Sequence, residues 1–86
     1  MAEEKIGVVI HYWSKLGVAG VHLTEGKLEV GDTIHVKGHT TDFTQPVDSM
    51  QVNNDSVETA GPGDDVGLKV VDHAREHDDV FRVTPD

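Results

Sequence analysis

The 86-residue chain has no cysteine, three prolines, one tryptophan, one tyrosine and two phenylalanines. Without cysteine it can form no disulfide framework, no thiolate zinc site and no thiol nucleophile. Its longest uninterrupted apolar run is three residues, 8–10, which is far too short for a membrane-spanning helix or the apolar region of a signal peptide. We therefore expect a cytoplasmic protein without membrane contact.

Basic residues are also scarce in this chain. Seven Lys and Arg residues against sixteen Asp and Glu residues give a formal net charge of −9. Such a charge repels polyphosphates at long range and keeps a small protein soluble and monomeric; it is also typical of a salt-adapted host. The lysines of the first half nevertheless leave room for a local basic patch there, and they are Lys5, Lys15, Lys27 and Lys37.

Valine is abundant, and its spacing predicts strands. β-Branched residues lose rotamers in helices and pack well on a pleated surface. Short apolar stretches separated by turn signals recur along the chain. In residues 5–13, four side chains fall on one face at a period of two, namely Ile6, Val8, Ile10 and Tyr12.

The whole pattern predicts one all-β domain, a small barrel or sandwich. Pro46 places an edge strand or a bulge in residues 43–52. No linker or repeat divides the chain, so the domain covers residues 1–86. We expect its barrel to run from about residue 5 to residue 83, with short disordered ends.

Two segments, residues 26–34 and 60–68, combine a Gly–Asp pair with alternating apolar residues. At each pair the glycine can adopt a positive φ in a hairpin turn, and the aspartate can accept a local backbone hydrogen bond. A glycine inside the following strand predicts a bulge or a close backbone approach. We interpret the residues of both segments as turn and core positions, and they are Gly26, Leu28, Gly31, Asp32, Gly63, Asp64, Val66 and Gly67.

The same two segments resemble stretches of domain II of translational GTPases such as elongation factor Tu. Residues 26–34 are similar to its G-x-L-x-V-G-D stretch, and residues 60–68 are similar to its A-x-x-G-D-x-V-G-L stretch. The resemblance covers nearly the whole chain and implies an antiparallel barrel of about six or seven strands, of the translation-protein type. Similar barrels also occur at the C-terminus of collagenase-like peptidases, as accessory modules without the active site.

The motifs of a GTPase are missing from the sequence. It has no G-x-x-x-x-G-K-[ST] phosphate loop and no guanine-reading N-K-x-D, so we expect neither GTP binding nor GTPase activity. In elongation factor Tu, domain II helps to hold the aminoacyl end of tRNA with a carboxylate and an arginine. The matching positions here are Ser49 and Gly61, so the resemblance does not carry over aminoacyl-tRNA binding.

No catalytic or metal site follows from the spacing of reactive residues. The chain has six histidines, but their spacing does not bring three ligands together. Its serines lack the context of a nucleophile elbow, and side chains fill the interior of a barrel this small. We expect a non-enzymatic protein without a metal or cofactor.

The candidate binding residues are Tyr12, Trp13 and Lys15, with His39 and Phe43 from the loop at residues 38–43. An aromatic ring beside a lysine can stack on a base or anchor a partner protein; the alternative is that the indole closes one end of the core. The resemblance favours a module that contacts ribosomal or transfer RNA, or the translation machinery, weakly. The acidity favours the alternative, an accessory module that binds a protein partner.

Overall fold

Antiparallel strand pairing organises the chain. The computed structural model describes residues 2–84, and in this range no helix is long and apolar enough to cross a membrane. The strands are β1 (Ala2–Trp13), β2 (Val18–Leu23), β3 (Leu28–Glu29), β4 (Thr33–Lys37), β5 (Asp42–Pro46), β6 (Met50–Val52), β7 (Asp55–Val57), β8 (Thr59–Ala60), β9 (Asp65–Lys69) and β10 (Asp79–Thr84).

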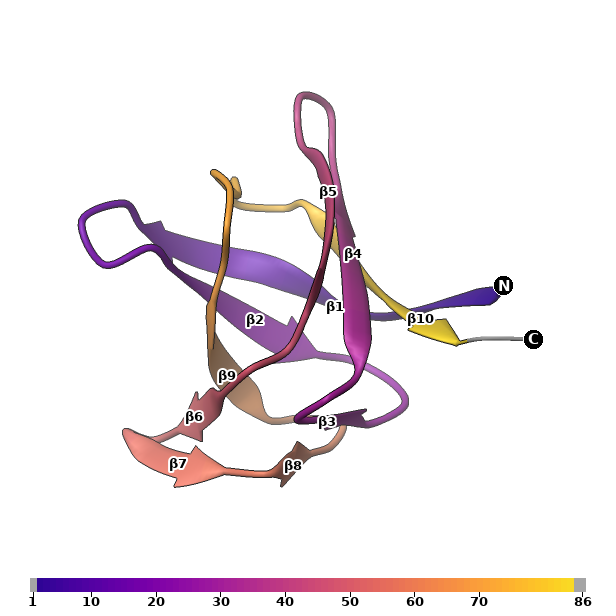
Figure 1. The fold of residues 1–86 in the computed structure, drawn as a ribbon, viewed down its shortest axis with the longest axis vertical. Helices are drawn as coiled ribbons and strands as arrows, with labels where there is room; N and C mark the ends of the chain where they lie inside the picture. The colour runs from indigo at the N-terminus through magenta and orange to yellow at the C-terminus, as the bar shows by residue number, and fades with distance from the viewer. Residues whose placement is uncertain (1, 85–86) are drawn as a thin grey trace.

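Eight of these strands form one sheet in the order β5-β4-β10-β1-β2-β9-β6-β7, and β3 pairs with β8 in a second, two-stranded sheet. The main sheet curves around the interior, and β1 and β10, the first and last strands along the chain, lie side by side within it (Figure 1). The predicted all-β antiparallel class is confirmed. The strands run beyond the expected range of 5–83, to Ala2 and Thr84; the ends expected to be disordered at residues 1 and 85–86 lie outside the described residues.

The predicted number of six or seven strands is too low, because strands of two or three residues are too short to show a period of two in the sequence. Asn53 and Asn54, with φ of 52° and 67°, form a two-residue turn that joins β6 to β7. Positive φ at both central residues is the geometry that keeps a tight hairpin in line with strand twist. The turn contains these two residues alone, since Asp55 already pairs with Val52.

Strand β1 does not keep the strict period of two that its sequence predicts. Its register with β10 shifts between Lys5 and Gly7, and its register with β2 shifts between Val9 and His11. Each β-bulge inserts one residue and moves the following side chains to the other face. The core residues of β1 are consequently Ile6 and Val9, whereas Ile10 is 46% exposed.

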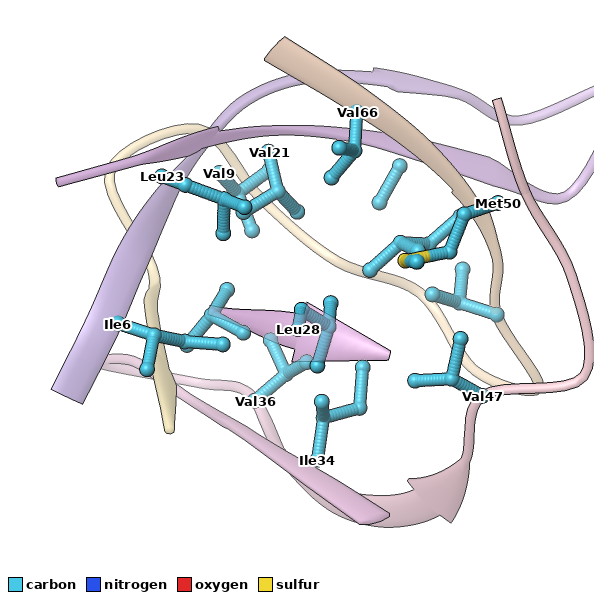
Figure 2. Packing of buried hydrophobic residues seen from close by; sticks show 14 of the residues in the cluster. Ile6, Val9, Val21, Leu23, Leu28, Ile34, Val36, Val47, Met50 and Val66 are labelled. Atoms are coloured by element: carbon cyan, nitrogen blue, oxygen red, sulfur yellow. The ribbon is translucent and has the colours of Figure 1, made fainter. Parts of the chain in front are cut away.

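The core lies between the curved strands and is made of aliphatic side chains. Leu28 of β3 sits at its centre, between inward-facing side chains of β1 and β2 on one side and of β4 on the other (Figure 2). Alternation works well outside β1: Ala19, Val21 and Leu23 of β2 are all buried. Val30, in contrast, is exposed because β3 ends at Glu29.

The two Gly–Asp turns have the predicted chemistry. Gly31 and Gly63 have φ of 98° and 91°. The carboxylate of Asp32 accepts a hydrogen bond from the Glu29 N–H at 2.9 Å, and that of Asp64 accepts one from the Gly61 N–H at 2.9 Å. The turns thus fix where β4 and β9 begin.

The prediction for Gly67 is wrong. It pairs in continuous register with Gly20 of β2 and Gln51 of β6, without a bulge. A Cβ at Gly67 would have its nearest neighbour 3.8 Å away, so no backbone crowds this position. The missing side chain of Gly67 instead lowers the outer surface of the sheet at this position, and strand pairing does not require a glycine there.

Candidate functional site

The outer face of the sheet carries an apolar hollow of about 450 Å³, here called the Trp13 groove. Its floor is formed by Gly20 and Gly67, which lie opposite each other in the β2–β9 register. Neither residue has a Cβ, so the sheet surface is low at this point while the strands on both sides carry side chains. The groove is lined by Ile10, Trp13, Leu16, Val18, Gly20, Gln51, Asn53, Asn54, Asp65, Val66 and Gly67.

One wall of the groove is hydrophobic and faces water. Ile10, Trp13 and Leu16 are 46%, 44% and 63% exposed. The Trp13 ring lies over the floor, with Cζ3 3.2 Å from the position that a Cβ on Gly20 would occupy. The same ring is tilted against the ring of His11, with 4.4 Å between ring centroids. The second bulge of β1, between Val9 and His11, helps to build this wall, because it places Trp13 on the outer face while Tyr12 packs against the core.

The opposite wall and one end of the groove are polar. Gln51 and the Asn53–Asn54 turn form the wall on the β6 side. Asp65 lies at the end of the floor, and its Oδ1 is 2.5 Å from Nδ1 of His22. Of the lining residues in the described range 2–84, Asp65 is the one that carries a formal charge at neutral pH.

The structure does not bring the five predicted binding residues together. Tyr12 and Phe43 pack against the core, and the Tyr12 ring contacts His73 with 4.5 Å between centroids. Trp13 points to the other face of β1, and the alternative that its indole closes the core is wrong. Lys15 is exposed in the turn between β1 and β2, while His39 lies in the β4–β5 turn, a separate projection (Figure 1).

His39 belongs to a second hollow, of about 570 Å³, between the β4–β5 turn and the loop before β10. Its lining carries both signs of charge, including Lys37, Glu76 and Asp79. The Asp78 carboxylate in this hollow is already used, since its Oδ2 accepts a hydrogen bond from the Arg75 N–H at 2.9 Å. Across residues 2–84, no group of three or more His, Asp or Glu side chains is placed to hold a metal ion.

A polar cluster over β4, called here the His35 cluster, was missed by the sequence reasoning. His35 Nδ1 is 3.0 Å from both carboxylate oxygens of Glu3, and its Nε2 is 2.5 Å from Oδ1 of Asp42. Hydrogen bonding to Asp42, then to Glu3, raises the pKa of His35 above its usual 6.5. The side chain is only 14% exposed. Cross-strand pairing of β1, β10, β4 and β5 creates this cluster, and no local motif encodes it.

Two of the four first-half lysines are paired with carboxylates rather than available for an open basic patch. Lys5 Nζ is 3.0 Å from Asp79 Oδ1, and Lys27 Nζ is 2.9 Å from Glu29 Oε1. Both ammonium groups are thus partly neutralised by neighbouring carboxylates. This arrangement gives no electrostatic support to the expected RNA contact.

Comparison with known proteins relates the chain to peptidases. It is 40% identical over 78 residues to an uncharacterized protease of Methanocaldococcus jannaschii, and 33% identical over 78 residues to a collagenase of Porphyromonas gingivalis. Each alignment covers 90% of this chain, which spans only 19% and 22% of these relatives. No family model matches the chain.

The fold is that of a solved peptidase domain. The C-terminal domain of a protein described as a U32 peptidase, from Geobacillus thermoleovorans, superimposes with a TM-score of 0.87 and 21% identity. The superposition covers 94% of this chain and 93% of that domain. At this identity the match establishes the fold alone.

These matches correct the sequence-based identification. The predicted resemblance to domain II of translational GTPases, and with it the predicted role at ribosomal or transfer RNA, is wrong: the chain resembles the C-terminal domain of U32 peptidases. The glycine and aspartate residues behind the first identification, such as Gly31 and Asp64, sit in hairpin turns. Glycine and aspartate recur wherever a fold needs such hairpin turns. These residues therefore indicate the turns of the fold and do not identify a binding partner.

Proposed function

We propose that this chain is a non-catalytic accessory module of the kind that forms the C-terminal domain of U32 peptidases, and that it binds polypeptide. The alternative left open by the sequence, a protein-binding accessory module, is the reading that the comparisons support. The observation that carries the proposal is the Trp13 groove. Three large apolar side chains that stay in contact with water on a small acidic protein favour a binding surface.

The chemistry of the groove favours protein over nucleic acid. Its wall is apolar, its amides can exchange hydrogen bonds with a peptide backbone, and its charged residue is acidic. Tryptophan is also one of the residue types enriched among the energetic anchors of protein interfaces. As an accessory module, the chain holds a polypeptide while a separate peptidase domain cleaves it.

We also propose that the curved sheet closes into a barrel through the side chain of Gln45. This residue of edge strand β5 is 6% exposed. Its Nε2 donates a hydrogen bond to the carbonyl of Lys69 at 2.8 Å, and its Oε1 accepts one from the Val71 N–H at 2.7 Å. The amide thereby links the free edge of β5, whose other edge pairs with β4, to the end of β9. A rigid, closed scaffold would hold the groove in one shape.

Retention on immobilised gelatin, an unfolded polypeptide, tests the proposed function. We expect the wild-type chain to be retained and Trp13→Ala to pass through, while gelatin remains uncleaved. Val71→Ala is the matched control, because Val71 is another exposed apolar residue, 77% exposed, outside the groove. Equal retention of Trp13→Ala and wild type, or no retention at all, would contradict the proposal.

A further inference from the structure

The direction and length of the Trp13 groove restrict what it can hold. The groove lies between β1 and β6 and has β2 and β9 as its floor. A chain segment lying in it therefore follows the strand direction. The low floor at Gly20 and Gly67 gives space for one apolar side chain beside the Trp13 ring.

The next outward position along β9 is acidic. Asp65 is two residues from Gly67, and alternate residues of a strand point to the same face, about 7 Å apart. Asp65 pairs with His22, which holds its Oδ1, and the aspartate side chain is 65% exposed. An extended peptide has the same two-residue repeat, so a side chain two positions from the apolar anchor reaches this carboxylate.

Charge selects the kind of side chain that arrives there. The charged residue of the groove is acidic, and the whole chain carries −9. At the opposite end of the floor, Lys69 pairs with Val18; it is four residues from Asp65, about 13 Å, which is beyond the screening length at physiological salt. A cationic segment is attracted by this surface, and an acidic one is repelled.

From this geometry we propose that the Trp13 groove recognises an extended segment of a protein in which an apolar residue and a Lys or Arg are two positions apart. The apolar side chain packs on the Gly20–Gly67 floor against Trp13. The basic side chain pairs with Asp65, and Gln51 hydrogen-bonds the peptide backbone. This inference rests on the proposed function and adds the sequence class of the bound polypeptide.

The emission of Trp13, the single tryptophan of the chain, reports binding directly. The probes are acetylated, amidated peptides without aromatic residues: Gly-Ser-Leu-Ser-Arg-Ser, the same peptide with Glu for Arg, and a spacing variant, Gly-Ser-Leu-Arg-Ser-Ser. We expect the first peptide to bind about fivefold more tightly than the spacing variant, and the Glu peptide to bind more weakly than either.

Asp65→Asn isolates the charge recognition. It is expected to remove the preference for the Arg peptide, whereas Asp48→Asn, which changes the net charge equally at an exposed residue outside the groove, leaves it intact. Equal binding of all three peptides by the wild type would overturn the inference, even if gelatin is retained. An emission change that depends on protein concentration alone would also overturn it, because a second copy would then fill the groove.

Discussion

The outer face of the sheet is built in two opposite ways. Over β2 and β9, the Trp13 groove exposes apolar side chains above two glycines, and most of its surface has no partner among residues 2–84. Over β4, the His35 cluster joins three strands through hydrogen bonds that satisfy both ring nitrogens. The polar groups of the His35 cluster are thus paired within the chain, whereas the apolar side chains of the Trp13 groove remain exposed to water. A change in the cluster should therefore alter stability, and a change in the groove should alter binding.

The largest expected effect follows from Trp13→Ala. Removal of an aromatic anchor costs about 2 kcal/mol of binding free energy. The affinity for the probe Gly-Ser-Leu-Ser-Arg-Ser, called here the Leu-x-Arg peptide, should therefore fall about 30-fold. The free energy of unfolding should change by less than about 1 kcal/mol, because the side chain is 44% exposed and outside the core. Peptide titration calorimetry and urea unfolding measure the two quantities. A large stability loss with unchanged affinity would assign Trp13 to the fold instead.

Gly20→Ala should weaken peptide binding next most strongly, about tenfold. The new Cβ would lie 3.2 Å from the Trp13 ring, so the floor rises and the indole must shift. Gly61→Ala is the control, since nothing lies within 4 Å of the Cβ there. Both variants should unfold at a similar or slightly higher denaturant concentration than the wild type, because neither glycine has a positive φ and alanine reduces the entropy of the unfolded chain. Undiminished binding by Gly20→Ala would show that the Gly20–Gly67 floor does not contact the peptide.

His35→Gln should change the pH dependence of stability and leave peptide affinity unchanged. The folded-state pKa of His35 is raised by Asp42 and Glu3. Its contribution is therefore fully present below the unfolded-state value of about 6.5 and is lost as the pH rises through the folded-state value.

Thermal unfolding from about pH 5.5 to pH 9 measures this contribution. The wild type should lose about 1 kcal/mol relative to His35→Gln over this range. Parallel profiles for the two proteins would show that the cluster adds nothing to stability.

The smallest effect should come from Lys5→Met, beside the His35 cluster. Lys5 and Asp79 form an ion pair at 3.0 Å, but their side chains are 49% and 44% exposed. Solvent-exposed pairs of this kind contribute about 0.5 kcal/mol or less. Urea unfolding at low and at high salt should show a difference within this limit that shrinks as salt rises. A loss above 1 kcal/mol would place this pair inside the stabilising network.

The sequence predicts the local features of this molecule well. The Gly–Asp turns and the edge position of Pro46 each depend on a few neighbouring residues, and both are confirmed. The bulges in β1 depend on its two partner strands, so periodicity misplaces Val8 and Ile10.

The candidate site was predictable only in part, for the same reason. Trp13 could be singled out as the single tryptophan, at the end of an expected strand and close to Lys15. Its partners Gly20 and Gly67 become neighbours only when β9 pairs with β2, and His35 meets Glu3 only across β10. The grouping of Trp13 with His39 and Phe43 fails because these residues point to different sides of the molecule.

An amide-shift map of the labelled chain, titrated with the Leu-x-Arg peptide, shows which part of the outer face binds. We expect shifts at the Trp13 indole N–H and at the amides of Gly20, Gln51 and Gly67, with no change around His35. Shifts centred on the His35 cluster, or an unchanged spectrum at saturating peptide, would contradict the assignment of binding to the Trp13 groove and of stability to the His35 cluster.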